Sequence, residues 1–240
     1  IAVDFTGQAV QLDEIREICK KYKLILIEDA AHSIGTRYKG ISVGSIADLT
    51  TFSFHPVKTI TCGEGGAILT NNEEYYKKML LFRTHGITRE PDLLTHSPFN
   101  GYNEQIDLGY NYRLTDVQAA LGTSQLRKMA SFSTRRKEIV KQYDEAFSTI
   151  PQLTIQKEIS ESDTTRHLYI IRIKPDTLKL DRNGIYKALN AENVGLQVHY
   201  IPVYYHPYYQ SIGYNNGLCP IAEKLYEEIR TIPLYYSLTD

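Results

Sequence analysis

The chain has 240 residues, a formal net charge of −1, and 42% hydrophobic and 23% charged residues, which is typical of a globular protein with one or two domains and a sizeable core. This near-neutral balance gives no electrostatic reason to expect binding to nucleic acid or to a membrane surface, and no apolar run reaches membrane-spanning length. Cys19, Cys62 and Cys219 are too widely spaced to suggest a metal site or a disulfide framework, so we expect reduced thiols and a cytoplasmic location.

The first part of the chain alternates helical and strand patterns. Residues 12–23 carry apolar side chains at helical spacing, and residues 24–30 form a short apolar run that ends in two acids. A helix followed by a near-continuous apolar strand indicates an α/β fold in which the strand is buried on both faces. Further strands are expected over residues 48–54 and 65–70.

The middle of the chain contains two predicted helices separated by a loop. Residues 72–86 have a helical pattern, and Gly86 is expected to end the helix. Residues 91–105 are expected to form a polar, broken loop. Residues 114–147 predict one long helix, with Thr115 as its N-cap and a kink near Gly122. This helix is expected to bridge two domains.

The pattern changes after residue 151. A strand is expected over residues 167–174, a helix over 181–195, a strand with an aromatic loop over 196–209, and an amphipathic helix over 219–233. The order indicates a small C-terminal α/β domain that packs on the first.

Three parts follow from these patterns. We predict a large α/β domain with a mainly parallel sheet over residues 1–125, a connecting helix over 126–150, and the small domain over 151–240.

Lys58 lies in the stretch TFSFHPVKTITCGEGGAIL (Thr51 to Leu69), between a strand pattern and a glycine-rich turn. A lysine with a lowered pKa can form a Schiff base with a substrate or with pyridoxal phosphate. A lysine at a strand end can also extend its amine to water, and position alone favours this second interpretation.

Other candidate residues lie before and around this lysine. Glu28 and Asp29 end a predicted strand, at the edge where open α/β sheets place ligands. A carboxylate there can keep a pyridine nitrogen protonated, as pyridoxal chemistry requires, or it can brace the following loop. His32 can reach the same ligand or remain an ordinary loop histidine. The Ser53 hydroxyl and the amides of the turn at residues 63–66 can bind a phosphate.

Three motifs, EDAAHSIG, SFHPVKTITCGEGG and GYNYRLTDVQAALG, occur in this order along the chain. Together with HYIPVYYHPYY and CPIAEKLYEEIRTIPLY near the C-terminus, they resemble the DegT/StrS-type nucleotide-sugar aminotransferases over essentially the whole chain. The resemblance implies fold type I of the pyridoxal-phosphate-dependent transferases, as in aspartate aminotransferase. It also implies a homodimer with shared active sites.

The resemblance assigns cofactor roles to five residues. Lys58 matches the catalytic Schiff-base lysine, and Asp29 matches the carboxylate that pairs with the pyridine nitrogen. His32 lies where the family places a Gln or His against the ring hydroxyl. Ser53 matches the phosphate-binding serine, and Asn111 matches an asparagine that reaches the phosphate of the partner's cofactor.

Four further residues are implied to bind the substrate. His55 would face the sugar, and Arg113 would face the substrate across the subunit interface. His199 and Tyr200 match a segment that closes over the sugar nucleotide, although His206 competes with His199 for this role.

Two stretches, FHPVKTIT and VHYIPVYYHPYY, are most similar to family members that aminate carbon 4 of a UDP-linked 2-acetamido-4-keto-6-deoxy sugar. These use glutamate as amino donor and supply pseudaminic acid for surface or flagellar glycans. Two alternatives stay open: transfer to a different keto sugar, and a non-catalytic relative that binds a ligand and regulates. A dehydratase of the same fold would carry histidine in place of Lys58.

The opening residues IAVDFTGQAV resemble a position beyond the family's phosphate-binding Gly-Thr/Ser turn and its ring-stacking aromatic residue. We therefore expect that the chain is part of a longer protein.

Overall fold

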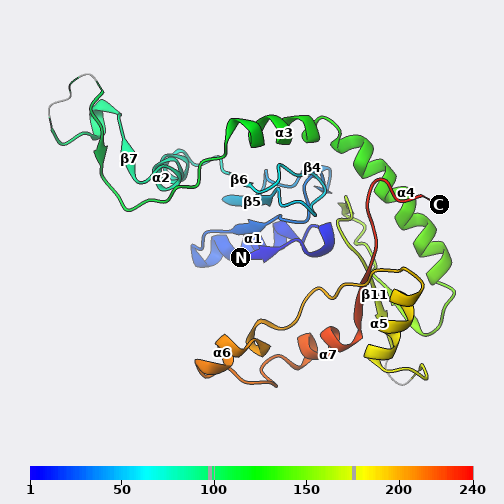
Figure 1. The fold of residues 1–240 in the computed structure, drawn as a ribbon. Coiled ribbons are helices and arrows are strands. Elements are labelled where there is room, and N and C mark those ends of the chain that lie inside the picture. Colours follow the sequence, from blue (N-terminus) through cyan, green and yellow to red (C-terminus); the bar gives the residue numbers. More distant parts are fainter. Residues whose placement is uncertain (97–98, 100, 175–176, 240) are drawn as a thin grey trace.

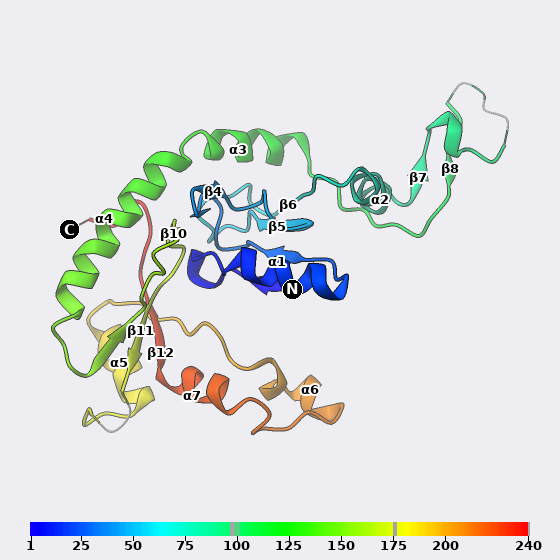
Figure 2. The same cartoon turned by 180° about the vertical axis from the view of Figure 1, so that it is seen from behind.

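The structure is a computed structural model that describes residues 1–96, 99, 101–174 and 177–239. Figure 1 shows a body that contains both termini and an arm that projects from it, and Figure 2 shows the same arrangement from behind. None of the helices in these residues is long and apolar enough to cross a membrane.

The N-terminal part of the body is an α/β unit. Its elements are β1 (Ala2–Val3), η1 (Phe5–Gly7), α1 (Leu12–Tyr22), β2 (Ile27–Asp29), β3 (Arg37–Tyr38), β4 (Ile41–Ser42), β5 (Leu49–Ser53) and β6 (Gly66–Leu69). Four strands form a sheet of order β1-β2-β5-β6. The pairs β1–β2 and β2–β5 are parallel and β5–β6 is antiparallel. The prediction of an α/β domain with a mainly parallel sheet is confirmed.

The predicted helix over residues 12–23 is confirmed as α1, which buries Leu12 against Leu26 in the first hydrophobic core. The strand predicted over residues 24–30 was too long. Leu24 and Ile25 are exposed, and only Ile27–Asp29 pairs with its neighbours. An apolar run alone does not show where sheet pairing starts, because pairing depends on the strands on either side.

The arm, which we define as residues 72–113, leaves the body after β6. It contains α2 (Glu73–Arg83), β7 (Ile87–Thr88), η2 (Pro91–Leu93) and β8 (Glu104–Gln105), and β7 pairs antiparallel with β8. The predicted helix ends three residues early, at Arg83, and the predicted loop over 91–105 contains η2 and β8. Residues 97, 98 and 100 of that predicted loop lie outside the described residues.

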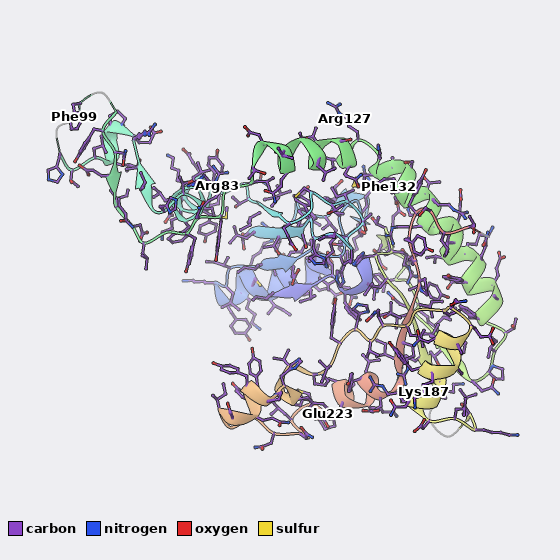
Figure 3. The ribbon with its side chains drawn as sticks, viewed as in Figure 1. Arg83, Phe99, Arg127, Phe132, Lys187 and Glu223 are labelled. Carbon is purple, nitrogen blue, oxygen red and sulfur yellow. The ribbon has the colours of Figure 1, made fainter. Side chains whose placement is uncertain are left out.

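The single helix predicted over residues 114–147 is in fact two helices, α3 (Asp116–Leu126) and α4 (Met129–Phe147). Thr115 caps α3 as predicted, in a capping box with Gln118. The break lies at Arg127, beyond the predicted kink at Gly122, and Figure 3 labels Arg127 at this bend. α3 runs beside the sheet and α4 runs along the C-terminal part, so the bend joins the two (Figure 1).

The C-terminal part is built on a second, antiparallel sheet of order β12-β11-β9. Its elements are β9 (Leu153–Ile155), β10 (Ser162–Asp163), β11 (Tyr169–Ile173), α5 (Arg182–Ala191), η3 (Val203–Tyr205), α6 (Pro207–Ser211), α7 (Pro220–Glu228) and β12 (Ile229–Ile232). The strand over residues 167–174 and the helix over residues 181–195 were predicted correctly in type, although both are shorter.

Two predictions for this part were wrong. Residues 196–209 form no strand: Gln197 makes one isolated bridge to Thr231, and η3 and α6 follow. The helix predicted over 219–233 ends at Glu228 and continues as β12, whose four residues are all buried. Helix and strand are both compatible with a short apolar segment, and here the free edge of β11 selects the strand.

A second hydrophobic core joins α4 to this sheet. Ile139 and Val140 of α4 pack with Tyr169, Ile171 and residues further along the chain. This core is separate from the one under α1. The exact division at residues 125 and 150 stays a prediction.

Two acids are fully buried in the first core region. Asp4 accepts from Val10 N (3.0 Å) and Ser33 Oγ (2.6 Å), and Glu28 Oε2 accepts from Thr50 Oγ1 (2.8 Å). Glu28 Oε1 has no hydrogen-bond partner among the described residues. Burial, together with the negative charge of Asp4, raises the pKa of Glu28 to about 7. A proton held by this carboxyl pair would remove the repulsion between the two groups.

Candidate active site

The parallel strands β2 and β5 end side by side and bring two predicted site residues to one edge of the sheet. Asp29 is the last residue of β2 and lies opposite Thr51, and Ser53 is the last residue of β5. Lys58 follows in the turn before β6, where its main-chain N donates to His55 O (3.0 Å). The strand order therefore explains why residues from distant motifs meet here.

Lys58 is half-buried in this turn. Burial lowers the pKa of its amine, and the negative charge of Asp29 partly opposes this shift. Asp29 Oδ1 accepts from Ala31 N at 3.1 Å, which fixes the carboxylate at the start of the following turn. The side chains of Lys58 and Asp29 are thus within electrostatic range of each other.

His32 belongs to the same cluster. Burial first, and then the charges of Lys58 and His199, lower its pKa to about 4, whereas Asp29 acts in the opposite direction. At neutral pH the ring is therefore uncharged. A neutral imidazole offers one donor and one acceptor, which suits a ligand with a hydroxyl or phenolate oxygen.

The C-terminal part contributes His199 and Tyr200, the two residues that the resemblance assigned to the substrate. His199 Nδ1 lies 2.8 Å from Thr231 Oγ1, and burial and Lys58 lower the pKa of its ring. Burial and Asp29 raise the pKa of Tyr200. His206 is exposed at the start of α6. His199 therefore lies within electrostatic range of Lys58.

Sequence reasoning missed two aromatic members of the cluster. The Phe5 ring centre lies 6.2 Å from that of His32 and 6.4 Å from that of Tyr200. The His167 ring centre lies 4.5 Å from that of His32. Neither residue belongs to the motifs that carry the resemblance. The only local signal was that His167 is the first residue of the strand predicted over residues 167–174, and no local pattern pointed to Phe5.

The two halves of the body meet at the turn after β1. Thr6 O accepts hydrogen bonds from His167 N (2.8 Å) and Leu168 N (3.3 Å). Gly7 has φ +105°, and a Cβ there would lie 2.9 Å from both His167 N and His32 O. Only glycine fits such a close approach of three backbone segments, so this position sets the spacing of the cluster.

The structure does not bring all predicted site residues together. His55 is exposed, and its Nε2 lies 3.7 Å from Glu64 Oε1. Asn111 and Arg113 are exposed on the arm, where the main chain of Asn111 forms a bridge with Thr84. Ser53 Oγ accepts a long bond of 3.4 Å from His55 N. The roles assigned to these residues stay predictions.

Metal ions are not indicated by the side chains seen here. In the described part of the chain, no group of three or more His, Cys, Asp or Glu residues is arranged to hold a metal ion.

Solved structures and curated sequences resemble this chain throughout. Helicobacter pylori PseC, an aminotransferase of pseudoaminic acid biosynthesis, superposes with a TM-score of 0.89 at 32% identity, over 99% of this chain and 61% of its own. The PLP-form of the putative sugar aminotransferase Spr1654 from Streptococcus pneumoniae superposes with a TM-score of 0.88 at 30% identity, over 99% and 63%. These similarities confirm the predicted fold type I.

Among curated sequences, a UDP-4-amino-4,6-dideoxy-N-acetyl-beta-L-altrosamine transaminase of Campylobacter jejuni is 42% identical over 210 residues, which are 88% of this chain and 54% of that protein. The chain spans 54–62% of the length of the first five curated relatives. The family model for DegT/DnrJ/EryC1/StrS aminotransferases matches residues 1–240. The chain therefore belongs to the DegT/DnrJ/EryC1/StrS aminotransferase family.

Proposed function

We propose that the protein is a pyridoxal-phosphate-dependent aminotransferase that acts on a nucleotide-linked keto sugar. One observation carries the proposal: Lys58, with a lowered pKa, lies within electrostatic range of Asp29 and of the rings of His32 and His199. A lysine in such a setting is a nucleophile, not a surface charge. Membership of the aminotransferase family supports the same reading.

The residues at the sheet edge fit pyridoxal phosphate. Lys58 supplies an amine for the aldehyde group, Asp29 supplies a carboxylate for the ring nitrogen, and Ser53 supplies a hydroxyl for the phosphate. The neutral His32 can hydrogen-bond to the oxygen on the ring. When bound, this cofactor supplies an electron-withdrawing ring that stabilises negative charge on the carbon attached to the nitrogen.

The residues themselves do three things in this mechanism. Lys58 Nζ would hold the cofactor through its aldehyde group and, as a free amine, would accept and return the proton that moves during the transfer. Its lowered pKa favours this role, because the amine must be uncharged to accept a proton. Asp29 would pair with the ring nitrogen of the cofactor, and the half-buried ring of His199 limits the access of water to the site. Tyr200 lies beside His199 and is exposed.

For the substrate, we propose a UDP-linked 4-keto-6-deoxy sugar that is aminated at carbon 4, with glutamate as donor, for pseudaminic acid and surface or flagellar glycans. The names of the Campylobacter jejuni relative and of Helicobacter pylori PseC support this choice. We propose that this sugar nucleotide is bound by His199, Tyr200 and His55 of one subunit and by Arg113 of a second subunit. We also propose a cytoplasmic location, in keeping with the free thiols of Cys19, Cys62 and Cys219.

We further propose a homodimer in which Asn111 and Arg113 of one subunit complete the active site of the other. Both side chains are exposed, and neither belongs to the cluster around Lys58. The guanidinium group of Arg113, exposed on a projecting arm, is suited to an anionic substrate phosphate or to a neighbouring subunit's site.

The test is turnover by the full-length protein of a panel of UDP- and dTDP-linked keto sugars with glutamate. We expect a yellow protein whose visible band bleaches on addition of glutamate, and amination of the UDP-linked 4-keto-6-deoxy sugar in preference to the others. Bleaching without transfer to any sugar would favour another acceptor. A colourless protein that binds the nucleotide sugar without turnover would support a non-catalytic relative instead.

A further inference from the structure

His167 stands out among the residues to which the predicted function assigns no role. It lies just before β11, in the C-terminal part, yet its ring contacts the N-terminal part: the ring centres of His167 and His32 are 4.5 Å apart, with an angle of 47° between their planes. Its exposed fraction is 5%. A histidine this buried between two halves of a protein contributes to how the halves fit together.

Both main-chain groups of His167 are fixed. Its N donates to Thr6 O at 2.8 Å, and its carbonyl O accepts from an NH group of Arg136 at 3.2 Å. The backbone therefore cannot swing the ring away from His32 without breaking contacts in both halves of the body. The position of this ring is set by tertiary structure on two sides.

The side chain is less well satisfied than the backbone. Nδ1 of His167 is buried and has no hydrogen-bond partner among the described residues. A buried polar atom without a partner lowers stability, and a phenylalanine or leucine of similar size would avoid this. A role in packing alone therefore does not explain a histidine at this position.

We propose that His167 is a positioning residue of the active site: its buried ring covers one side of His32, keeps water away from it, and fixes the plane in which His32 faces its ligand. The identification of that ligand as a cofactor rests on the proposed function. The contact between the rings of His167 and His32 is observed directly and does not depend on that function.

The surrounding charges agree with this role. Burial first, and then the charges of His32, Lys58, Arg136 and His199, lower the pKa of His167 to about 2. Lys58 and His199 act on His32 in the same direction, and Asp29 opposes them. Two neutral rings packed together can stay in contact across the physiological pH range, whereas two charged rings would repel each other.

The test measures the ionisation of His32 by NMR in the full-length, cofactor-free protein, in wild type and in two variants. His167→Phe keeps an aromatic ring of similar size, so His32 should keep its low pKa. His167→Ala opens the covered side to water, so the pKa of His32 should rise by about one unit or more towards its ordinary value of about 6.5. His96→Ala, an exposed histidine on the arm, is the control and should change nothing.

An unchanged titration of His32 in folded His167→Ala would overturn the proposal. If that variant does not fold, contacts between the ring protons of His32 and His167 in wild type decide instead: their presence supports the proposal, and their absence overturns it. With pyridoxal phosphate added, His167→Phe should keep the visible band and its pH dependence, whereas His167→Ala should shift that pH dependence. A wild-type protein that binds no cofactor would overturn the proposed function, while the titration of His32 would stand as an independent result.

Discussion

The body and the arm of this protein differ in which side chains they bury and which they expose to solvent. The body buries ionisable groups: Lys58 and His167 are held where burial lowers their pKa values. The arm exposes apolar groups: α2 has no buried residue, and Leu108 and Tyr112 are 79% and 70% exposed. Figure 3 shows Phe99 at the far tip of the arm, well away from the body, and Arg83 on the side of the arm nearer the body.

Each arrangement is costly when the chain is alone. Burying a charged amine is unfavourable unless a ligand or a neighbouring charge compensates, and exposing large apolar side chains forgoes the hydrophobic effect. The body therefore indicates a site made for a ligand, and the arm indicates a surface made for another protein surface. Four predictions separate these two roles.

The largest effect is expected for Lys58→Ala. Removal of the amine should abolish transamination, a loss of at least about a thousandfold, and leave at most non-covalently bound cofactor. Lys187→Ala, an exposed lysine on α5, is the matched control and should keep full activity. Borohydride reduction followed by peptide mapping identifies the modified lysine, and a label on any lysine other than Lys58 would contradict the assignment.

Asp29→Asn should come second. Asparagine keeps the shape and can keep the bond from Ala31 N, but it cannot hold a ring nitrogen protonated. Activity should fall by about a hundredfold or more, while thermal stability changes little. Asp92→Asn on the arm is the control. A variant that unfolds yet keeps its specific activity per folded molecule would instead make Asp29 a structural residue.

Glu28→Gln concerns the pH dependence of the body's stability. The folded state raises the pKa of Glu28 from 4.5 to about 7, so it keeps a proton that the unfolded chain has lost. The contribution of Glu28 to the free energy of unfolding is therefore fully present below pH 4.5 and is lost as the pH rises through about 7.

Glutamine cannot ionise, and its amide can donate to Asp4 as a protonated Glu28 would. Chemical denaturation at several pH values should therefore show a flatter profile for the variant, with a gain on the order of 2–3 kcal/mol above pH 7. Glu192→Gln, at an exposed position, should leave the wild-type profile unchanged. An equally steep profile in Glu28→Gln would place the titration elsewhere.

The smallest expected effect is a twofold loss of activity in a mixed dimer, which tests the role of the arm. A heterodimer with Lys58→Ala in one subunit and Arg113→Ala in the other has both defects in one site and leaves the second site intact. The purified heterodimer should regain up to about half of wild-type activity, although each parent homodimer is inactive. If the heterodimer stays inactive, or if active protein is monomeric by light scattering, the shared-site proposal fails.

The sequence by itself determined the parts of this protein that depend on local pattern. The helical spacing of residues 12–23, the cap at Thr115 and the strands around Asp29 and Ser53 all follow from side chains close together in the chain. The family resemblance followed in the same way, because its motifs are continuous stretches.

Only the tertiary structure decided which distant residues meet. β12 forms because the edge of β11 is free to pair, and the helix expected over residues 219–233 therefore stops at Glu228. His167 joins His32 through the close approach at Gly7, and His199 is grouped with Lys58 while His206 remains exposed. Burial and pairing depend on neighbours that are far apart in sequence, so no local pattern could have predicted them.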